Sequence, residues 1–452
     1  MYSMSYLAQI RRHRLQELLA RATDFAARYD ASRPSLVIVP GGMGSRLLRQ
    51  PPGAAAYELW LDLAPVMRGE LERLAMDEET QERDRVPVFP SGELSSVVKS
   101  YDGVWEFFRF RANVAGFGYD WRRSPEHEAE YLEIFLGLLR EKVLEKNLPD
   151  PLPHLTLYAH SQGGLVAKLF VERIVRKGDD AGAWFSKLVT CCTPFYGTYS
   201  HISRYYVGEP LANLFTGGAD AVARIGLSME GPYILLPAPR SILERNLERL
   251  GLQRYPVRDR DTDAAVDPYA ARSRFRPQAS AAFLARAAHQ FAAIDRELPP
   301  HAAMRTFHFR SDIRGGPAGR ESLELTWKNV QGQSYSAENE SNPVRSNELE
   351  GGKGDGTVPW WSARLASTPD SRVFDFYGVE HGGAAEHPAM LDLLWKLMRN
   401  EAVSTGPHFA PEAPSSLMLT NVVAEELRSA PDPNARFAAL PKDLQRKLLQ
   451  IA

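Results

Sequence analysis

This sequence has little cysteine, no long uninterrupted apolar segment and almost no net charge. Its two cysteines, Cys191 and Cys192, are adjacent, and a disulfide between neighbouring residues is rare and strained. A disulfide framework is therefore excluded, and we expect the pair to be small buried residues in a strand. A chain without disulfides suits a reducing compartment, so the expected location is cytoplasmic.

Long apolar runs are missing as well. No segment of about 18 apolar residues occurs, which excludes a membrane-spanning helix. The first thirty residues carry charges throughout, unlike the apolar core of a signal peptide. The apolar spacing within 1–33 predicts instead an amphipathic helix packed on the rest of the protein, with Leu7, Ile10, Leu15, Leu18, Leu19 and Phe25 on its buried face.

The charges balance, with 54 basic against 56 acidic residues and a net charge of -2. This balance gives no basic surface for a nucleic-acid partner. No His, Cys and Asp cluster has the spacing of metal ligands, so we expect no metal and no other cofactor. The segment "VPGGMGSRL" (39–47) lacks the full G-x-G-x-x-G pattern, which argues against a dinucleotide site.

Strand and helix patterns alternate along the chain. Short apolar runs predict strands, and longer segments with a period near 3.6 predict helices. A strand, a crossover helix and another strand in succession indicate an α/β protein whose mostly parallel sheet is covered by helices on both faces. The predicted strands lie within 35–42, 154–160, 185–197 and 371–379, and the predicted helices within 130–147, 163–178 and 388–400.

This pattern divides the chain into a core and additions. The core is expected at 34–200 and 311–400, with a helical cap inserted between two strands at 201–310. The Gly-, Ser- and Asn-rich stretch 314–356 is expected to form loops. The tail 401–452 is expected to be an appendage with two short helices, and 67–76 fits either a lid or the core.

One serine lies at a sharp corner, in "LTLYAHSQGGLVAKLF" (155–170). Ala159, Ser161 and Gly163 follow the G-x-S-x-G pattern of a nucleophile elbow, with Ala in the first position. The strained backbone of such a serine requires small neighbours, and the turn exposes the hydroxyl beside the start of the next helix. We therefore expect Ser161 to be a catalytic nucleophile.

A nucleophilic serine needs a base and an acid that orients the base, in the chain order serine, acid, histidine. His381 follows a predicted strand in a glycine-rich loop, whereas His387 precedes a proline and is expected to cap a helix. Asp355, in "GGKGDGTVP", resembles an ordinary turn residue but has the required position between Ser161 and His381. The rivals are His387 and the tail residue His408 for the base, and Asp375, in the middle of a predicted strand, for the acid.

An oxyanion hole needs two N–H donors. The residue after the nucleophile, Gln162, would supply one of them. The glycine-rich segment around Gly42 would bring its backbone close to the substrate, and Met43 would supply the second donor. His160, which adjoins the nucleophile, is expected to support the elbow.

Several segments together resemble the lecithin:cholesterol acyltransferase family, which includes phospholipid:diacylglycerol acyltransferases and enzymes like lysosomal phospholipase A2. The resemblance spans about 40–400, and its specific part is the pair "GYDWRRS" (118–124) and "GDGTVP" (354–359). The other matching segments, in family order, are "VPGGMGSRL", "ELWLDL" (58–63), "AHSQGG" (159–164), "CTPFYGT" (192–198) and "VEHGG" (379–383).

The resemblance implies an α/β-hydrolase fold with a cap and a lid, and ester chemistry on acyl lipids through an acyl-enzyme. It assigns the same nucleophile, acid and base as the residue pattern, and it suggests that Asp120 and Arg122 form a buried structural network beside the pocket. The pocket candidates are Gly42, Tyr119, Asp120 and Trp121, together with Tyr205 and Tyr206 of the cap segment 201–215. Ordinary helix packing is the alternative for the two cap tyrosines.

The substrate and the acceptor stay open at this level. The reaction is hydrolysis if water attacks the acyl-enzyme and acyl transfer if an alcohol does, depending on how the cap excludes water. A soluble ester or amide is the nearest alternative substrate, and a silent binding module is the alternative from another class. The pair Trp360–Trp361, if exposed, would favour peripheral contact with a membrane or lipid. Whether the tail 401–452 mediates assembly or binds a protein partner stays open.

Overall fold

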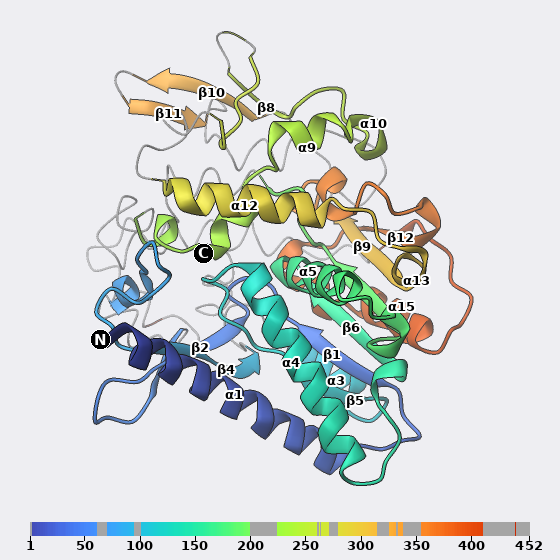
Figure 1. Ribbon diagram of the computed structural model, residues 1–452. Helices are drawn as coiled ribbons and strands as arrows, with labels where there is room; N and C mark the ends of the chain where they lie inside the picture. Colours follow the sequence, from blue (N-terminus) through green and yellow to red (C-terminus); the bar gives the residue numbers. More distant parts are fainter. Residues whose placement is uncertain are drawn as a thin grey trace.

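A wholly parallel sheet of seven strands forms the centre of the molecule (Figure 1). The computed structural model describes residues 2–60, 70–94, 101–198, 224–259, 262, 264–270, 279–313, 325–330, 333–337, 354–409 and 439. The strand order is β13-β12-β9-β7-β6-β1-β5. The strands are β1 (Ser35–Val39), β5 (Asn113–Gly116), β6 (Leu155–His160), β7 (Lys187–Cys191), β9 (Thr306–Asp312), β12 (Val373–Tyr377) and β13 (His408–Phe409). This sheet agrees with the predicted α/β class.

The order of the strands creates a natural site at one edge of the sheet. The chain first adds β5 on one side of β1 and then returns to add β6 on the other side. The loops that follow β1 and β6 therefore lead to helices on opposite faces of the sheet, and the strand order has a topological switch point between β1 and β6. The glycine-rich segment after β1 and the serine corner after β6 both lie at this switch point, at the carboxyl ends of the strands.

Helices cover both faces of the sheet. Alternate side chains of β1 point to opposite faces, with Val37 and Val39 in one core and Leu36 and Ile38 in the other. The first core is closed by α1 (Tyr2–Arg28), α4 (Pro125–Leu144), α5 (Gln162–Arg176) and α12 (Ala281–Ile294). The second core is closed by α3 (Asp102–Phe108) and α15 (Pro388–Met398).

The N-terminal helix packs on the body of the protein, but not through the whole predicted face. Leu18 and Phe25 are buried in α1, whereas Leu7 and Leu19 are exposed. The buried line of the helix instead includes the charged residue Arg14, whose guanidinium lies 3.3 Å from the Glu128 carboxylate of α4. The apolar spacing could not reveal this face, because the charged residue Arg14, paired with Glu128, lies where the pattern requires an apolar residue.

The stretch between β7 and β9, which contains the segment 201–310 predicted to be a cap, is an insertion between two neighbouring strands of the central sheet. Its described elements are mostly helical: η4 (Gly231–Leu235), α9 (Arg240–Glu244), α10 (Leu247–Leu250), α12 and α13 (Pro300–Ala303). One strand, β8 (Val257–Asp259), pairs with β10 (Leu325–Val330), which pairs with β11 (Gln333–Ala337). The core resumes at Thr306, five residues before the predicted boundary, and part of the predicted loop 314–356 forms these two strands.

A second, smaller sheet follows the glycine-rich loop along the chain. It consists of β2 (Ser45–Arg49), β3 (Tyr57–Trp60) and β4 (Val88–Leu94), with β2 in the middle. Because β2 begins directly after the glycine-rich loop, this sheet anchors the far end of that loop. The segment 67–76 is described only from Glu70, where η1 (Glu70–Leu74) buries Leu71 and Leu74.

The tail begins as part of the core. His408–Phe409 forms the edge strand β13 beside β12, so the first residues of the predicted appendage extend the central sheet. Its two predicted short helices lie outside the described residues. The remaining 3-10 helices are η2 (Leu152–His154), η3 (Ala181–Ala183), η5 (Trp360–Ala363), η6 (Asp370–Arg372) and η7 (His381–Glu386). Among the described helices, none combines the length and the apolar character needed to cross a bilayer.

Candidate active site

Ser161 occupies a strained corner between β6 and α5. Its backbone angles are φ 54° and ψ -129°, a region that non-glycine residues rarely adopt. The Ser161 N–H donates to the Cys191 carbonyl oxygen over 2.8 Å, and the Ser161 carbonyl accepts from Gly164 N at 3.0 Å. These bonds hold the corner against the carboxyl end of β7, with the serine at the start of a helix.

The second and third residues after the serine, Gly163 and Gly164, are glycines because no larger residue fits there. A Cβ on Gly163 would lie 2.3 Å from the Pro40 carbonyl oxygen and 2.5 Å from the Val39 carbonyl oxygen. A Cβ on Gly164 would lie 1.9 Å from Thr193 Oγ1. The helix therefore approaches the neighbouring loops more closely than any side chain would permit.

His381 and Asp355 lie next to Ser161 in a hydrogen-bonded row. His381 Nε2 is 2.9 Å from Ser161 Oγ, and His381 Nδ1 is 2.7 Å from Asp355 Oδ2. The three side chains are buried, with residue exposures of 7% for Ser161, 5% for His381 and 2% for Asp355. Serine hydroxyl, imidazole and carboxylate in this sequence are the arrangement that activates a serine nucleophile.

Backbone groups hold the Asp355 carboxylate in place. Asp355 Oδ1 accepts hydrogen bonds from Thr357 N at 3.0 Å and Val358 N at 2.7 Å. The His381 N–H donates to the Asp355 carbonyl oxygen at 2.9 Å, which joins the two loops. Ile313 N also donates to Gly354 O at 2.9 Å, so the chain returns to the end of β9 just before Asp355. Asp355 therefore lies at the carboxyl end of β9, more than forty residues after that strand ends.

The rival residues have other partners. Asp375 lies in β12 and pairs with Arg310, with 2.7 Å between Oδ1 and Nε. His387 is the N-cap of α15, where its Nδ1 accepts from Ala389 N at 3.3 Å. The His408 ring stacks on Phe376 at 4.9 Å between centroids. None of these three contacts involves Ser161 or the Asp355–His381 pair.

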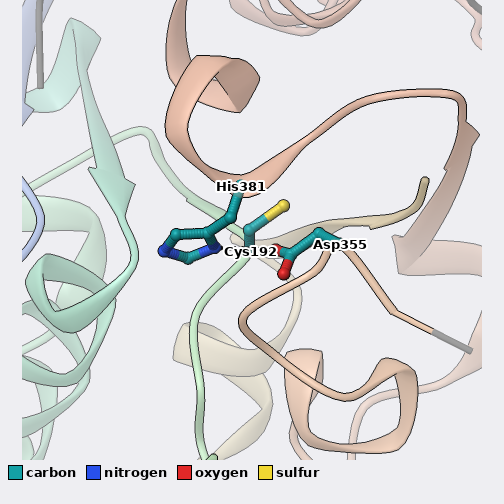
Figure 2. A group of neighbouring side chains, drawn as sticks. All are labelled: Cys192, Asp355 and His381. Carbon is teal, nitrogen blue, oxygen red and sulfur yellow. Dashed lines mark hydrogen bonds and ion pairs between the residues drawn. The ribbon is translucent and has the colours of Figure 1, made fainter. Parts of the chain in front are cut away.

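Cys192 lies next to the Asp355–His381 pair, as Figure 2 shows. Its sulfur and one ligand atom of each partner all fall within 4.8 Å of one another, a grouping that the sequence spacing did not suggest. The pKa of the Cys192 thiol is raised well above its ordinary value, mainly by a hydrogen bond with Cys191 and also by burial. The thiol therefore holds its proton more tightly than an exposed cysteine does.

The glycine-rich loop after β1 lies against the serine corner. A Cβ on Gly42 would come 2.7 Å from Oε1 of Gln162, so loop and helix are in direct contact. Met43 has φ 62°, and its carbonyl oxygen accepts from Trp60 Nε1 at 3.0 Å. Gln162 is the first residue of α5, where backbone N–H groups have no partner within the helix.

The "GYDWRRS" segment forms a buried ionic network. Arg122 is 0% exposed and lies 2.8 Å from both Asp120 Oδ2 and Glu82 Oε1. Burial by itself would lower the pKa of Arg122, but the charges of Asp120 and Glu82 raise it. Asp120 and Arg122 therefore form a buried charge pair.

Tyr119 and Trp121, the other candidates from this segment, are also buried. Trp121 packs edge-on against Trp60 at 5.1 Å, which connects it to the loop that contains Met43. The Gly231 N–H of the insertion donates to the Arg122 carbonyl oxygen at 2.7 Å, and its own carbonyl accepts from Gln162 Nε2 at 3.2 Å. Gly231 therefore joins this segment to the serine corner.

Two groups of predicted residues have a different outcome. Trp360 and Trp361 are 5% and 1% exposed, so the exposed aromatic pair that would favour contact with a lipid surface is not present at these two positions. Trp360 packs instead on Tyr377, with 5.6 Å between ring centroids. Tyr205 and Tyr206 lie outside the described residues, as do positions 67–69 of the segment 67–76.

Sequence comparison places the chain in no family, since no family profile and no curated protein matches it. Several solved structures align with most of this chain at low sequence identity. The Tle4-Tli4 complex is 15% identical with a TM-score of 0.49, covering 81% of this chain and 98% of that chain. The mature lipase BlEst2 of Bacillus licheniformis is 13% identical with a TM-score of 0.36, covering 82% and 93%. An α/β-hydrolase enzyme from a Medee basin deep-sea metagenome library is 10% identical with a TM-score of 0.31, covering 83% and 92%.

This protein has the α/β-hydrolase fold. The parallel sheet of seven strands with helices on both faces, and the serine corner after the central strand β6, are its architecture. The fold alone leaves the chemistry undetermined, because unrelated functions use it.

Proposed function

We propose that this protein is a serine-dependent hydrolase or acyltransferase of lipid esters. One observation carries the proposal: Ser161 Oγ, His381 and Asp355 form a continuous hydrogen-bonded row at the topological switch point of the sheet. A catalytically silent module has no need for a serine held in a strained conformation at the start of a helix, because that strain costs about 1–3 kcal/mol.

The proposed reaction begins with proton transfer. His381 Nε2 takes the Ser161 proton as Oγ bonds to the ester carbonyl carbon, and Asp355 stabilises the imidazolium. The carbonyl oxygen becomes an oxyanion that accepts from the Gln162 and Met43 amides. The ester C–O bond then breaks, His381 gives its proton to the leaving alcohol, and the acyl group stays on Ser161.

The second half of the reaction restores the enzyme. His381 removes a proton from water or an acceptor alcohol, whose oxygen attacks the acyl-Ser161 carbonyl carbon. Collapse of this intermediate breaks the acyl–Oγ bond, and His381 returns its proton to Ser161. Water yields a carboxylic acid, and an alcohol yields a new ester.

A lipid is proposed as the substrate because of the specific motifs. "YDWR" and "GDGTVP" together resemble the lecithin:cholesterol acyltransferase family, and "GDGTVP" provides the Asp355 loop described above. The buried network of Arg122 would hold the segment that contains Tyr119 and Trp121 rigidly beside the glycine-rich loop.

A fluorophosphonate probe and p-nitrophenyl esters of increasing chain length test this proposal. We expect the probe to label the wild type but not Ser161→Ala, and turnover to rise with acyl chain length. Turnover restricted to short esters would indicate that the substrate is a soluble ester and not a lipid. An unlabelled wild type, in detergent and with lipid vesicles as well as in buffer, would contradict the catalytic role.

A further inference from the structure

Two buried side chains outside the catalytic row join three of its loops. Tyr101, the N-cap of α3, is 1% exposed, and so is His160, the last residue of β6. Tyr101 reaches the glycine-rich loop after β1, and His160 reaches the loop that contains His381. The sequence singled out His160 only as a support of the elbow and did not single out Tyr101.

The hydrogen bonds between these groups define where each proton lies. The Gly41 N–H donates to Tyr101 Oη at 2.7 Å, so the hydroxyl is an acceptor on that side. Its own proton is available for His160 Nδ1, which lies 3.0 Å away. With Nδ1 as an acceptor, a neutral ring carries its proton on Nε2, and that group donates to the His381 carbonyl oxygen at 3.1 Å. The result is a directed chain from the glycine-rich loop to the backbone of His381.

The chain continues into the acid loop through the His381 N–H, which donates to the Asp355 carbonyl oxygen at 2.9 Å. Packing leaves its members little freedom to shift. A Cβ on Gly44 would lie 3.2 Å from Tyr101 Cε2, and the His160 and His381 rings are 5.0 Å apart. Burial also raises the pKa of Tyr101, so its hydroxyl keeps the proton that it donates.

We propose that Tyr101 and His160 are positioning residues that fix the distance between the oxyanion loop and the His381 imidazole. This inference rests on the proposed function. The pair acts through Gly41 and the His381 backbone, whereas the reacting groups are Ser161 Oγ, His381 Nε2 and the Gln162 and Met43 amides. Removing either side chain would loosen the geometry that the transition state needs. It would therefore weaken transition-state stabilisation more than it weakens binding of the substrate in the ground state.

The first test is Tyr101→Phe, which deletes the hydroxyl and keeps the ring. We expect kcat to fall roughly 10- to 100-fold with KM changed by less than about twofold, as for a loss that affects the transition state alone. The inhibition constant of a trifluoromethyl ketone, which forms a tetrahedral adduct with the serine, should rise by the same factor as kcat falls. A matched control is Tyr233→Phe, because Tyr233 Oη also accepts from a backbone amide, Ser280 N, and donates to a carbonyl, Leu227 O, each at 2.9 Å. It should lose comparable stability and keep kcat.

A second variant covers the case in which Tyr101→Phe does not fold. In His160→Gln the side-chain amide can still reach the His381 carbonyl but has no acceptor at the Nδ1 position. We expect the same selective loss of kcat. The kcat of the double variant should be about that of the less active single variant, because both side chains belong to one chain of hydrogen bonds. Unchanged kcat and inhibitor affinity, or a rise in KM alone, would overturn the inference.

Hydrogen exchange separates this inference from the proposed function. Even if the wild type proves inactive, Tyr101→Phe should speed exchange in peptides covering 39–44 and 380–386, and Tyr233→Phe should not. Unchanged exchange in both peptides would overturn the inference in an active or an inactive protein. An inactive wild type with faster exchange would contradict the proposed function and leave the structural link intact.

Discussion

At the scale of single residues, two aspartates with opposite surroundings separate a catalytic from a structural role. Asp355 accepts from His381 Nδ1 and from two backbone amides, whereas Asp375 pairs with Arg310 on the surface of the sheet. The motif order selected Asp355 over Asp375, and the structure brings Asp355 to the histidine. Its catalytic role stays a prediction.

Asp355→Asn should leave the fold intact and lower kcat by about 10³- to 10⁴-fold, because an amide no longer selects the imidazole tautomer that has its proton on Nδ1. Ester turnover and the thermal midpoint measure the two effects. Asp375→Asn is the matched control and should change kcat by less than about twofold. Equal losses in both variants would remove Asp355 from its proposed role.

Glycine at the serine corner leads to a second prediction. Gly163→Ala places a Cβ against two backbone oxygens, 2.3 and 2.5 Å away, which cannot move like a flexible side chain. We expect a loss of about 1–3 kcal/mol or more in unfolding free energy and a strong loss of activity. Gly137→Ala, in the middle of α4 with nothing within 4 Å, should instead be neutral or stabilising in denaturant titration. A neutral Gly163→Ala would mean that helix and loop are less tightly packed than described.

At the scale of elements, the insertion is joined to the core by polar contacts as well as apolar packing. Tyr196 Oη, just after β7, donates to Asp295 at the end of α12 over 2.9 Å and accepts from Ala366 N at 3.0 Å. Lys168 Nζ of α5 donates to the Arg296 carbonyl oxygen at 3.1 Å. These contacts join residues that lie between 99 and 170 positions apart, and no local pattern indicates them.

Tyr196→Phe should loosen α12, because Asp295 at the end of that helix would lose the Tyr196 hydroxyl as a donor, and the Ala366 amide would lose its acceptor as well. The expected cost is about 1–3 kcal/mol in unfolding free energy, together with faster hydrogen exchange in α12. Tyr255→Phe is the control, since the Tyr255 hydroxyl donates to Ala238 O at 3.3 Å, within the insertion. Unchanged exchange in α12 for Tyr196→Phe would show that the Tyr196 hydroxyl does not hold the helix.

At the scale of the whole molecule, the N-terminal helix adds a pH dependence to stability. Burial raises the pKa of Glu128 to about 7 despite the nearby Arg14. The folded protein therefore holds a proton on Glu128 that the unfolded chain releases above pH 4.5. The contribution of this group to stability is present below that pH and is lost as the pH rises to about 7.

Glu128→Gln should flatten the fall in unfolding free energy between about pH 4.5 and 7, by at most about 1.4 kcal/mol per pH unit. The difference from wild type is the quantity to measure by urea titration, because burial lowers the pKa of His127 to about 4 and opposes the trend. Glu133→Gln, also in α4, should not alter this window, since Lys177 and Arg173 lower the pKa of Glu133 against the effect of its burial. Identical pH profiles of wild type and Glu128→Gln would contradict the assignment.

The amino-acid sequence by itself determined the parallel α/β class and the residues that could form the row. Strand periodicity, the small residues around Ser161 and the order serine, aspartate, histidine are local features, and local features can be read along the chain. Only the tertiary structure decided which partners meet. The burial of Trp360 and Trp361, the exposure of Leu7 and Leu19, and the Tyr101–His160 link depend on segments distant in sequence. No local sequence pattern indicates a hydrogen bond or a buried face when the partner residues belong to an element that is distant in the sequence.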